Sequence, residues 1–77
     1  MYFRIQAMKE KYNRIKSVLA EQEKSSLWLA EQINRDKSTV SRWCTNDMQP
    51  SIETLFLIAK KLNVTAKELL NDALMGK

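Results

Sequence analysis

The sequence lacks histidine altogether and has one cysteine, one proline and one glycine among its 77 residues. A lone cysteine excludes a disulfide within the chain, and without histidine the usual cysteine and histidine zinc sites cannot form. The commonest general base of enzymes is missing too, as is the side chain that changes charge between about pH 5 and 8. These absences argue against an enzyme, a metalloprotein and a pH switch.

Long hydrophobic runs are also absent. No apolar stretch approaches the roughly 18 residues that a membrane span needs. The first five residues, MYFRI, lack the longer apolar region and the cleavage site of a signal peptide. The single cysteine needs no oxidising compartment. We therefore expect a cytoplasmic protein without a membrane partner.

The chain is small and basic. Hydrophobic residues make up 44% and charged residues 29%, which is typical of a globular domain, and 77 residues hold only one core. Such a domain has little room for a deep pocket, so we expect neither a cofactor nor a small-molecule ligand. Thirteen Lys and Arg residues against nine Asp and Glu give a net charge of +4. This balance favours a polyanionic partner.

Apolar residues recur at three- and four-residue spacing and predict an all-α domain. The five expected helices cover about residues 8–22, 26–33, 37–45, 52–62 and 66–73. No stretch alternates apolar and polar residues long enough to predict a strand. Asparagine tolerates the left-handed conformation that glycine usually supplies at helix ends. We therefore expect Asn34, Asn46 and Asn63, each of which follows an apolar-periodic stretch, to end helices.

The second and third expected helices are joined by residues 34–36 alone, which is the layout of a helix-turn-helix. On a helical wheel, the buried side of helix 37–45 carries Val40, Trp43 and Cys44. The opposite side carries short polar groups and two cations: Lys37, Ser38, Ser41 and Arg42. Serine can contact any base edge and arginine can bind guanine, so this side could read a DNA major groove. It could equally be the solvated face of an ordinary helix, and the wheel leaves both interpretations open.

Four runs of sequence carry a resemblance to a known family: LAEQIN at 29–34, STVSRW at 38–43, QPSIETL at 49–55 and NVTAKELL at 63–70. In this order and spacing they resemble the Cro and lambda-repressor type of helix-turn-helix, the XRE family, over about residues 12–71. The resemblance implies a compact five-helix lambda-repressor-like DNA-binding domain with the helix-turn-helix at about 26–45. Residues 1–11 would then be an N-terminal extension that could elongate the first helix, and residues 72–77 a C-terminal tail.

The resemblance also implies a function. Such proteins are bacterial or phage transcription regulators, more often repressors than activators, that bind double-stranded DNA as homodimers. A dimer on a palindromic operator would contact half-sites one helical turn apart, about 34–36 Å. Through DNA the protein would be associated with the nucleoid.

By position, the resemblance assigns base contacts to Lys37, Ser38 and Arg42. It assigns flanking or phosphate contacts to a larger set: Lys24, Ser26, Arg35, Thr39, Ser41, Thr45, Asn46 and Gln49. The stretch 45–49 resembles a loop that lays backbone amides against phosphates. Many relatives carry a buried acid and arginine where this chain has Cys44 and Leu19, so we expect these two apolar residues to lie close together.

Some apolar residues lie off the expected core. We expect helix 52–62 to turn Leu55, Phe56, Ala59 and Leu62 inward and Leu57 outward, and helix 26–33 to turn Leu27 and Trp28 away from its buried side. Either the terminal segments cover these residues, or Leu27, Trp28 and Leu57 form a dimer or partner surface. The second option defines an alternative function, a protein–protein interaction module such as an antitoxin-like partner.

Overall fold

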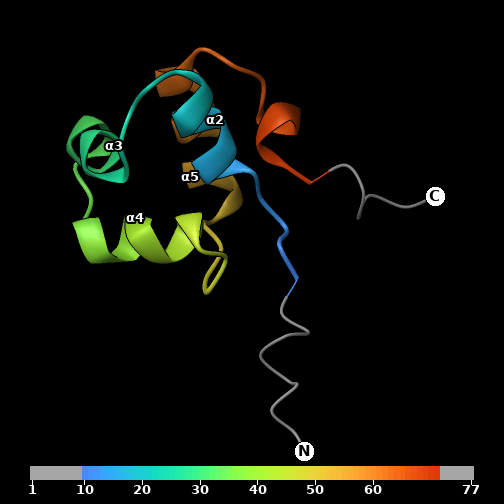
Figure 1. Ribbon diagram of the computed structural model, residues 1–77, viewed down its shortest axis with the longest axis horizontal. Helices are drawn as coiled ribbons and strands as arrows, with labels where there is room; N and C mark the ends of the chain where they lie inside the picture. Colours follow the sequence, from blue (N-terminus) through green and yellow to red (C-terminus); the bar gives the residue numbers. More distant parts are fainter. Residues whose placement is uncertain (1–9, 72–77) are drawn as a thin grey trace, which may run out of the picture.

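A computed structural model describes residues 10–71 and shows an all-α domain (Figure 1). Its elements are α2 (Ile15–Glu21), α3 (Ser26–Ile33), α4 (Lys37–Cys44), α5 (Ile52–Leu62) and the 3-10 helix η1 (Ala66–Leu69). The predicted bounds 26–33 and 52–62 are confirmed, and α4 ends one residue before the predicted 45. Within residues 10–71 there is no strand, and the pairing of extended backbone recorded there is one antiparallel bridge between Asn13 and Leu70.

The first predicted helix, 8–22, is wrong at its start, because residues 10–14 are not helical and α2 begins at Ile15. Positions 8 and 9 lie outside the described residues. The Asn13 side-chain oxygen accepts a hydrogen bond from the Ile15 amide at 3.0 Å, a local contact that competes with helix formation. The segment instead pairs with the end of the chain, where the Arg14 amide donates to the Leu69 carbonyl at 2.7 Å.

The last predicted helix, 66–73, is also wrong. The described part is the four-residue η1, after which Leu70 has an extended backbone, and residues 72–73 lie outside the described range. The same pairing explains the early stop, because the Asn71 amide donates to the Tyr12 carbonyl at 2.9 Å instead of continuing a helix.

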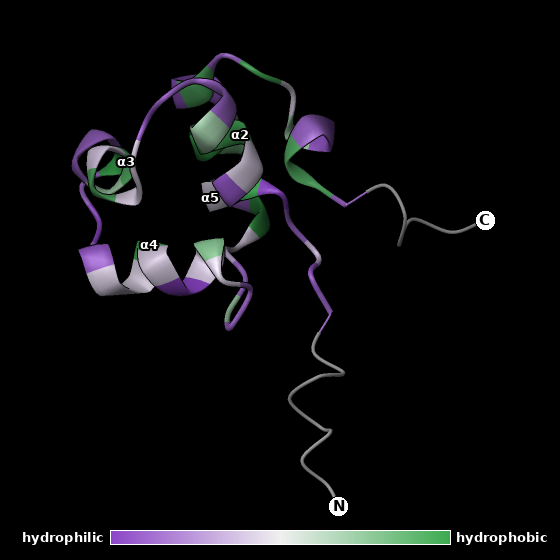
Figure 2. Cartoon of the chain, viewed as in Figure 1, coloured by the Kyte–Doolittle hydropathy of each residue, from purple (hydrophilic) through white to green (hydrophobic). Residues whose placement is uncertain are grey.

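Within residues 10–71, α2 to α5 and η1 all contribute to one apolar core, which Figure 2 shows as hydrophobic ribbon turned toward the centre of the domain. The largest fully buried side chains are Ile15, Leu29, Ile58, Leu62, Leu69 and Val40. From α4, Val40 and Trp43 are buried as predicted, whereas Cys44 is only half-buried. The core therefore holds α4 by one side and leaves its other side exposed.

The buried side of α5 differs from the prediction. Phe56 is 59% exposed, Ile58 is fully buried, and Leu57 is half-buried against the core. Thr54 is buried as well, and its hydroxyl accepts a hydrogen bond from the Ser51 hydroxyl at 3.0 Å. The buried apolar residues Leu55, Ile58, Ala59 and Leu62 keep a regular three- and four-residue spacing. The expectation for Phe56 was wrong because Phe56 lies off the face that these residues form.

Each of the helices α2 to α5 ends with the same backbone closure. A residue with positive φ follows each helix: Glu23, Asn34, Asn46 and Asn63. The next amide then donates to a carbonyl five residues back, as from Lys24 to Leu19 at 2.8 Å and from Val64 to Ala59 at 3.0 Å. This is the Schellman arrangement, which usually employs glycine. The three predicted asparagine ends are confirmed, and Glu23 is a fourth that the sequence pattern did not reveal.

In the described residues, none of the helices has the length and apolarity needed to cross a membrane.

Replacing Glu23 with glycine should stabilise the fold. In the left-handed region, glutamate has a steric cost of about 1–2 kcal/mol, which glycine does not have. Part of this gain is lost, because an unfolded chain with glycine has more conformational freedom to lose on folding. We expect Glu23→Gly to raise the free energy of unfolding by about 0.5–1 kcal/mol in urea titrations.

The matched control is Glu31→Gly, which also removes an exposed carboxylate but lies inside α3. Glycine in a helix interior should lower the free energy of unfolding by about 1 kcal/mol. The same sign of change in both variants would contradict the closure described for α2.

Candidate nucleic-acid interface

The exposed side of α4 faces away from the rest of the domain. In Figure 1, α4 runs along one edge of the domain, joined to α3 at its N-terminal end. Its outward side chains are exposed and polar: Lys37, Ser38, Ser41 and Arg42. Thr39 is half-buried. The residues that the resemblance assigns to base contacts thus lie on one accessible helix face.

Asp36 starts α4 as its N-cap. Its carboxylate accepts hydrogen bonds from the amides of Ser38 at 3.1 Å and Thr39 at 3.3 Å, and from the Ser38 hydroxyl. These bonds, the hydroxyl bond first, lower the pKa of the exposed Asp36 carboxyl below its usual value. The hydrogen bond to Asp36 therefore fixes the orientation of the Ser38 hydroxyl.

Three adjoining hollows follow α4 along the side that faces α2 and α3. The first, of about 390 Å³, lies between the starts of α3 and α4 and shares Ser26 and Ser41 with the second, of about 330 Å³. The second shares Lys16, Cys44 and Thr45 with the third, of about 290 Å³. We call these three hollows the α4 groove.

The α4 groove is lined by cations. Its lining residues include Lys11, Arg14, Lys16, Lys24 and Lys37 and no Asp or Glu. An array of cations beside an exposed helix produces a positive potential that attracts a polyanion. Lys11, Arg14 and Lys16 were not among the predicted site residues, because only the packing of α2 and the segment before it beside α4 brings them to this groove.

Two of the predicted phosphate-contacting residues lie in this groove. Ser26 is the first residue of α3, where free amides and the positive end of the helix dipole favour an anion. Lys24 Nζ lies 4.4 Å from the centre of the Trp28 ring, a cation–π contact that restrains the lysine. The groove therefore receives the charge of Lys24 and the partial positive charge at the start of α3.

The backbone amides after α4, which the resemblance places against phosphates, have hydrogen-bond partners within the protein. The amides of Thr45, Asn46, Asp47 and Met48 donate to carbonyls of α4, at 2.9 to 3.3 Å. They satisfy the last turn of the helix, whose carbonyls have no partners within it. The phosphate contacts of residues 45–49 stay a prediction.

The side chains of Asn46 and Gln49 also bond within the protein. Asn46 is buried, its side-chain oxygen accepts from the Asn13 amide at 3.0 Å, and its Nδ2 donates to the Asn13 carbonyl at 3.2 Å. Gln49 donates to Asn46 at 3.0 Å and accepts from Asn13 Nδ2 at 2.7 Å. Because Asn13 Nδ2 also donates to the Trp43 carbonyl at 2.9 Å, this network fixes the end of α4 to the segment before α2.

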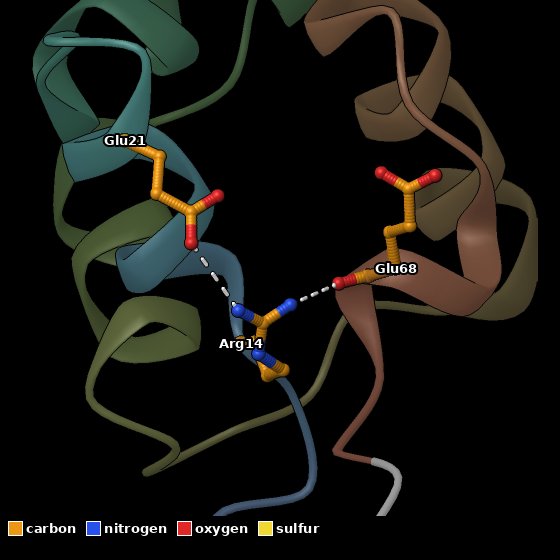
Figure 3. Close-up of polar contacts among 3 residues, drawn as sticks. All are labelled: Arg14, Glu21 and Glu68. Carbon is orange, nitrogen blue, oxygen red and sulfur yellow. Dashed lines mark hydrogen bonds and ion pairs between the residues drawn. The ribbon is translucent and has the colours of Figure 1, made fainter.

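The guanidinium of Arg14 ties the same segment to two other elements, as Figure 3 shows. It donates to the Glu68 carbonyl at 2.8 Å and forms an ion pair with Glu21 at 3.4 Å. The pair is exposed, so it adds little stability. Its geometric effect is to hold residues 10–14 beside α2 and η1.

Thr45, Arg35 and Leu27 are exposed. The Thr45 hydroxyl lies 2.8 Å from an Asp47 carboxylate oxygen, and Arg35 donates to the Thr54 hydroxyl at 3.4 Å. Leu27 is 50% exposed and lines the α4 groove beside Lys37. It therefore lies at the candidate interface.

Trp28 and Leu57 are half-buried and pack against the core. Of the three residues predicted for a dimer or partner surface, Leu27 is thus the exposed one. The strongly exposed apolar side chains of α5 are instead Ile52, at 69%, and Phe56.

Cys44 lies beside Leu19, since both line the same hollow. Burial raises the pKa of the Cys44 thiol, and the positive charge of Lys16 partly opposes this shift. Within residues 10–71, no group of three or more His, Cys, Asp or Glu side chains is placed to hold a metal ion.

Comparison with known proteins agrees with this geometry. The chain matches the sequence profile of the helix-turn-helix family over residues 15–69. It is similar to the crystal structure of a candidate DNA-binding protein from Bacteroides fragilis, with 48% identity, a TM-score of 0.76, and coverage of 78% of this chain and 97% of that chain. No curated protein matches the sequence.

Together, α3, the short turn and the exposed α4 define a helix-turn-helix protein. The chain belongs to the XRE-type helix-turn-helix family.

The buried amide of Asn13 should be essential for stability. Asn13→Ala leaves the Ile15 amide and the Gln49 side-chain oxygen without their Asn13 partner, and the Trp43 carbonyl keeps only its bond from the Asn46 amide. Each buried group left unsatisfied costs about 1–3 kcal/mol. We expect the free energy of unfolding to fall by about 2–3 kcal/mol, measured by urea titration.

Gln32→Ala is the control, because this amide is exposed on α3. It should change the free energy of unfolding by less than about 0.5 kcal/mol. Equal losses in both variants would show that the Asn13 network does not stabilise the end of α4.

Proposed function

We propose that this protein is a transcription regulator, acting as a repressor, that binds a specific sequence of double-stranded DNA. The observation that carries the proposal is the α4 groove. A row of lysines lies beside a helix whose outward side carries only polar and cationic groups. A DNA strand bordering the major groove would lie against these lysines while α4 enters the groove. The relative from Bacteroides fragilis, described as a candidate DNA-binding protein, supports the same function.

In this proposal, α4 reads bases and the α4 groove binds backbone phosphates. Arg42 is exposed and can make a bidentate contact with guanine O6 and N7, and Lys37 is the first residue of the helix. Lys16, Lys24 and the start of α3 at Ser26 bind phosphates and set the register of the helix on the duplex. Binding, rather than catalysis, is the activity that these groups support.

We further propose that the protein acts as a homodimer on a palindromic operator, with α5 at the dimer contact. Ile52 and Phe56 lie one turn apart and are strongly exposed. On the same side of the helix, Glu53 lies near the N-terminal end and Lys60 near the C-terminal end. If two copies of α5 met antiparallel about Phe56, each Glu53 would approach the other copy's Lys60.

Selection from random duplex DNA tests the proposed function. We expect the wild-type protein to enrich one sequence at moderate salt. Arg42→Ala should reduce affinity for that sequence by about 1–3 kcal/mol and relax the preference at one position, because a lost base contact affects only the base that it reads. Failure of the wild type to enrich any sequence would contradict the proposal.

Two lysine variants serve as controls for that selection. Lys16→Ala should keep the sequence preference but weaken binding to all duplexes. It should also reduce the slope of log affinity against log salt concentration by about one. Lys61→Ala removes an exposed lysine of α5 that does not line the α4 groove. It should leave the salt dependence unchanged.

The dimer contact can be tested separately by sedimentation of the protein with and without its selected duplex. Phe56→Glu should abolish dimers of the free protein and the cooperativity with which two copies occupy the palindromic duplex, since the charge would be buried at the contact. Tyr12→Glu, which changes another exposed aromatic residue, should leave the stoichiometry as in the wild type. Two copies of Phe56→Glu bound with unchanged cooperativity would contradict the α5 contact.

A further inference from the structure

The two serines on the outward side of α4 differ in their hydrogen bonds. The Ser38 hydroxyl bonds to Oδ2 of Asp36, the same oxygen that accepts the amides of Ser38 and Thr39. No hydrogen bond from the Ser41 hydroxyl is found in the described part of the chain. One serine is therefore oriented by its neighbour, and the other can rotate.

A hydroxyl has one proton to donate and two lone pairs that accept. An ionised carboxylate only accepts, so the Ser38 proton must point at Asp36. The carboxylate stays ionised at neutral pH, because the same hydrogen bonds lower the pKa of Asp36. What Ser38 presents to the surroundings is thus an oxygen that accepts.

We propose that Asp36 restricts the Ser38 hydroxyl to accepting hydrogen bonds from DNA. Ser38 then contacts the amino group of adenine or cytosine and disfavours guanine and thymine at that position. In the major groove, adenine N6 and cytosine N4 donate hydrogen bonds, whereas guanine O6 and thymine O4 accept them. An accepting oxygen beside a carboxylate pairs with the first two and opposes the last two. This inference rests on the proposed DNA binding, and Asp36 acts in it as a positioning residue.

The charge of Asp36 adds to the selectivity. A carboxylate at the entry to the major groove repels carbonyl oxygens of the bases, and Lys37 beside it limits the effect on the phosphates. Ser41 lacks such a partner and should tolerate either kind of base edge. We therefore expect strict base selection at the position that Ser38 contacts and weak selection at the position that Ser41 contacts.

Selection from random duplexes with five proteins tests the inference: wild type, Asp36→Gly, Asp36→Asn, Ser38→Ala and Thr65→Gly. Glycine removes the acceptor but is tolerated at an N-cap, where it costs only a few tenths of a kcal/mol. Asparagine keeps an oxygen that can accept the Ser38 proton. Thr65→Gly removes the N-cap of η1 instead and controls for loss of a cap as such.

We expect one position of the wild-type site to favour adenine or cytosine by roughly tenfold, the upper range for one hydrogen bond. That preference should disappear in Ser38→Ala and Asp36→Gly, weaken but keep its direction in Asp36→Asn, which retains the acceptor and loses the charge, and stay unchanged in Thr65→Gly. The other positions of the site should keep their preferences in all five proteins.

Three results would overturn the inference. The position lost in Ser38→Ala could favour guanine or thymine in the wild type, or Asp36→Gly could keep the wild-type preference there. In both cases the protein would still select a sequence, so the proposed function would stand. If the wild type selected no sequence at all, the proposed function and this inference would fail together.

Discussion

The candidate interface depends on the hydrogen bonds of the buried residue Asn13. Its side chain bonds to the Trp43 carbonyl, to Gln49 and to the amide of Ile15 at the start of α2. The Asn46 side chain also accepts a hydrogen bond from the Asn13 amide and donates one to the Asn13 carbonyl. These contacts join the segment before α2 to the end of α4. Because α2 carries Lys16, the same contacts set the lysine beside the helix that we propose enters DNA.

Stability and recognition are divided between the two sides of α4. Val40 and Trp43 are buried in the core, which fixes the rotation of the helix about its axis. With that rotation fixed, Arg42 and Ser38 must point outward. The helix termini add further order: Asp36 caps the start, and the amides of residues 45–48 satisfy the end. A helix of only eight residues is held in this way without contributing any outward side chain to the fold.

Much of the fold could be predicted from the sequence, because helix ends and apolar spacing are local properties. The ranges 26–33 and 52–62 and the three asparagine ends follow from neighbouring residues alone. The errors have non-local causes. Asn13 and Leu70 form a bridge across 57 residues of sequence, which stops helices that the apolar spacing would continue. Phe56 is exposed because packing in the core selects the face of α5 that carries Leu55, Ile58 and Leu62.

The candidate site was predicted less completely than the fold. Lys37, Ser38 and Arg42 share a helix, so their common face could be predicted from periodicity. Lys16 reaches the same surface only through the packing of α2 against α4, and no spacing along the chain indicates it. Nor does the sequence reveal that the amides of the loop after α4 are used within the protein, because this depends on backbone geometry at Asn46.

The central claim, that α4 and its groove form the DNA-binding surface, is tested most directly by mapping amide chemical shifts in the ¹⁵N-labelled protein as the selected duplex is added. We expect the largest changes in α4, in the first turn of α3 and at Lys16. Changes confined to the exposed face of α5, with α4 unaffected at saturation, would contradict the account.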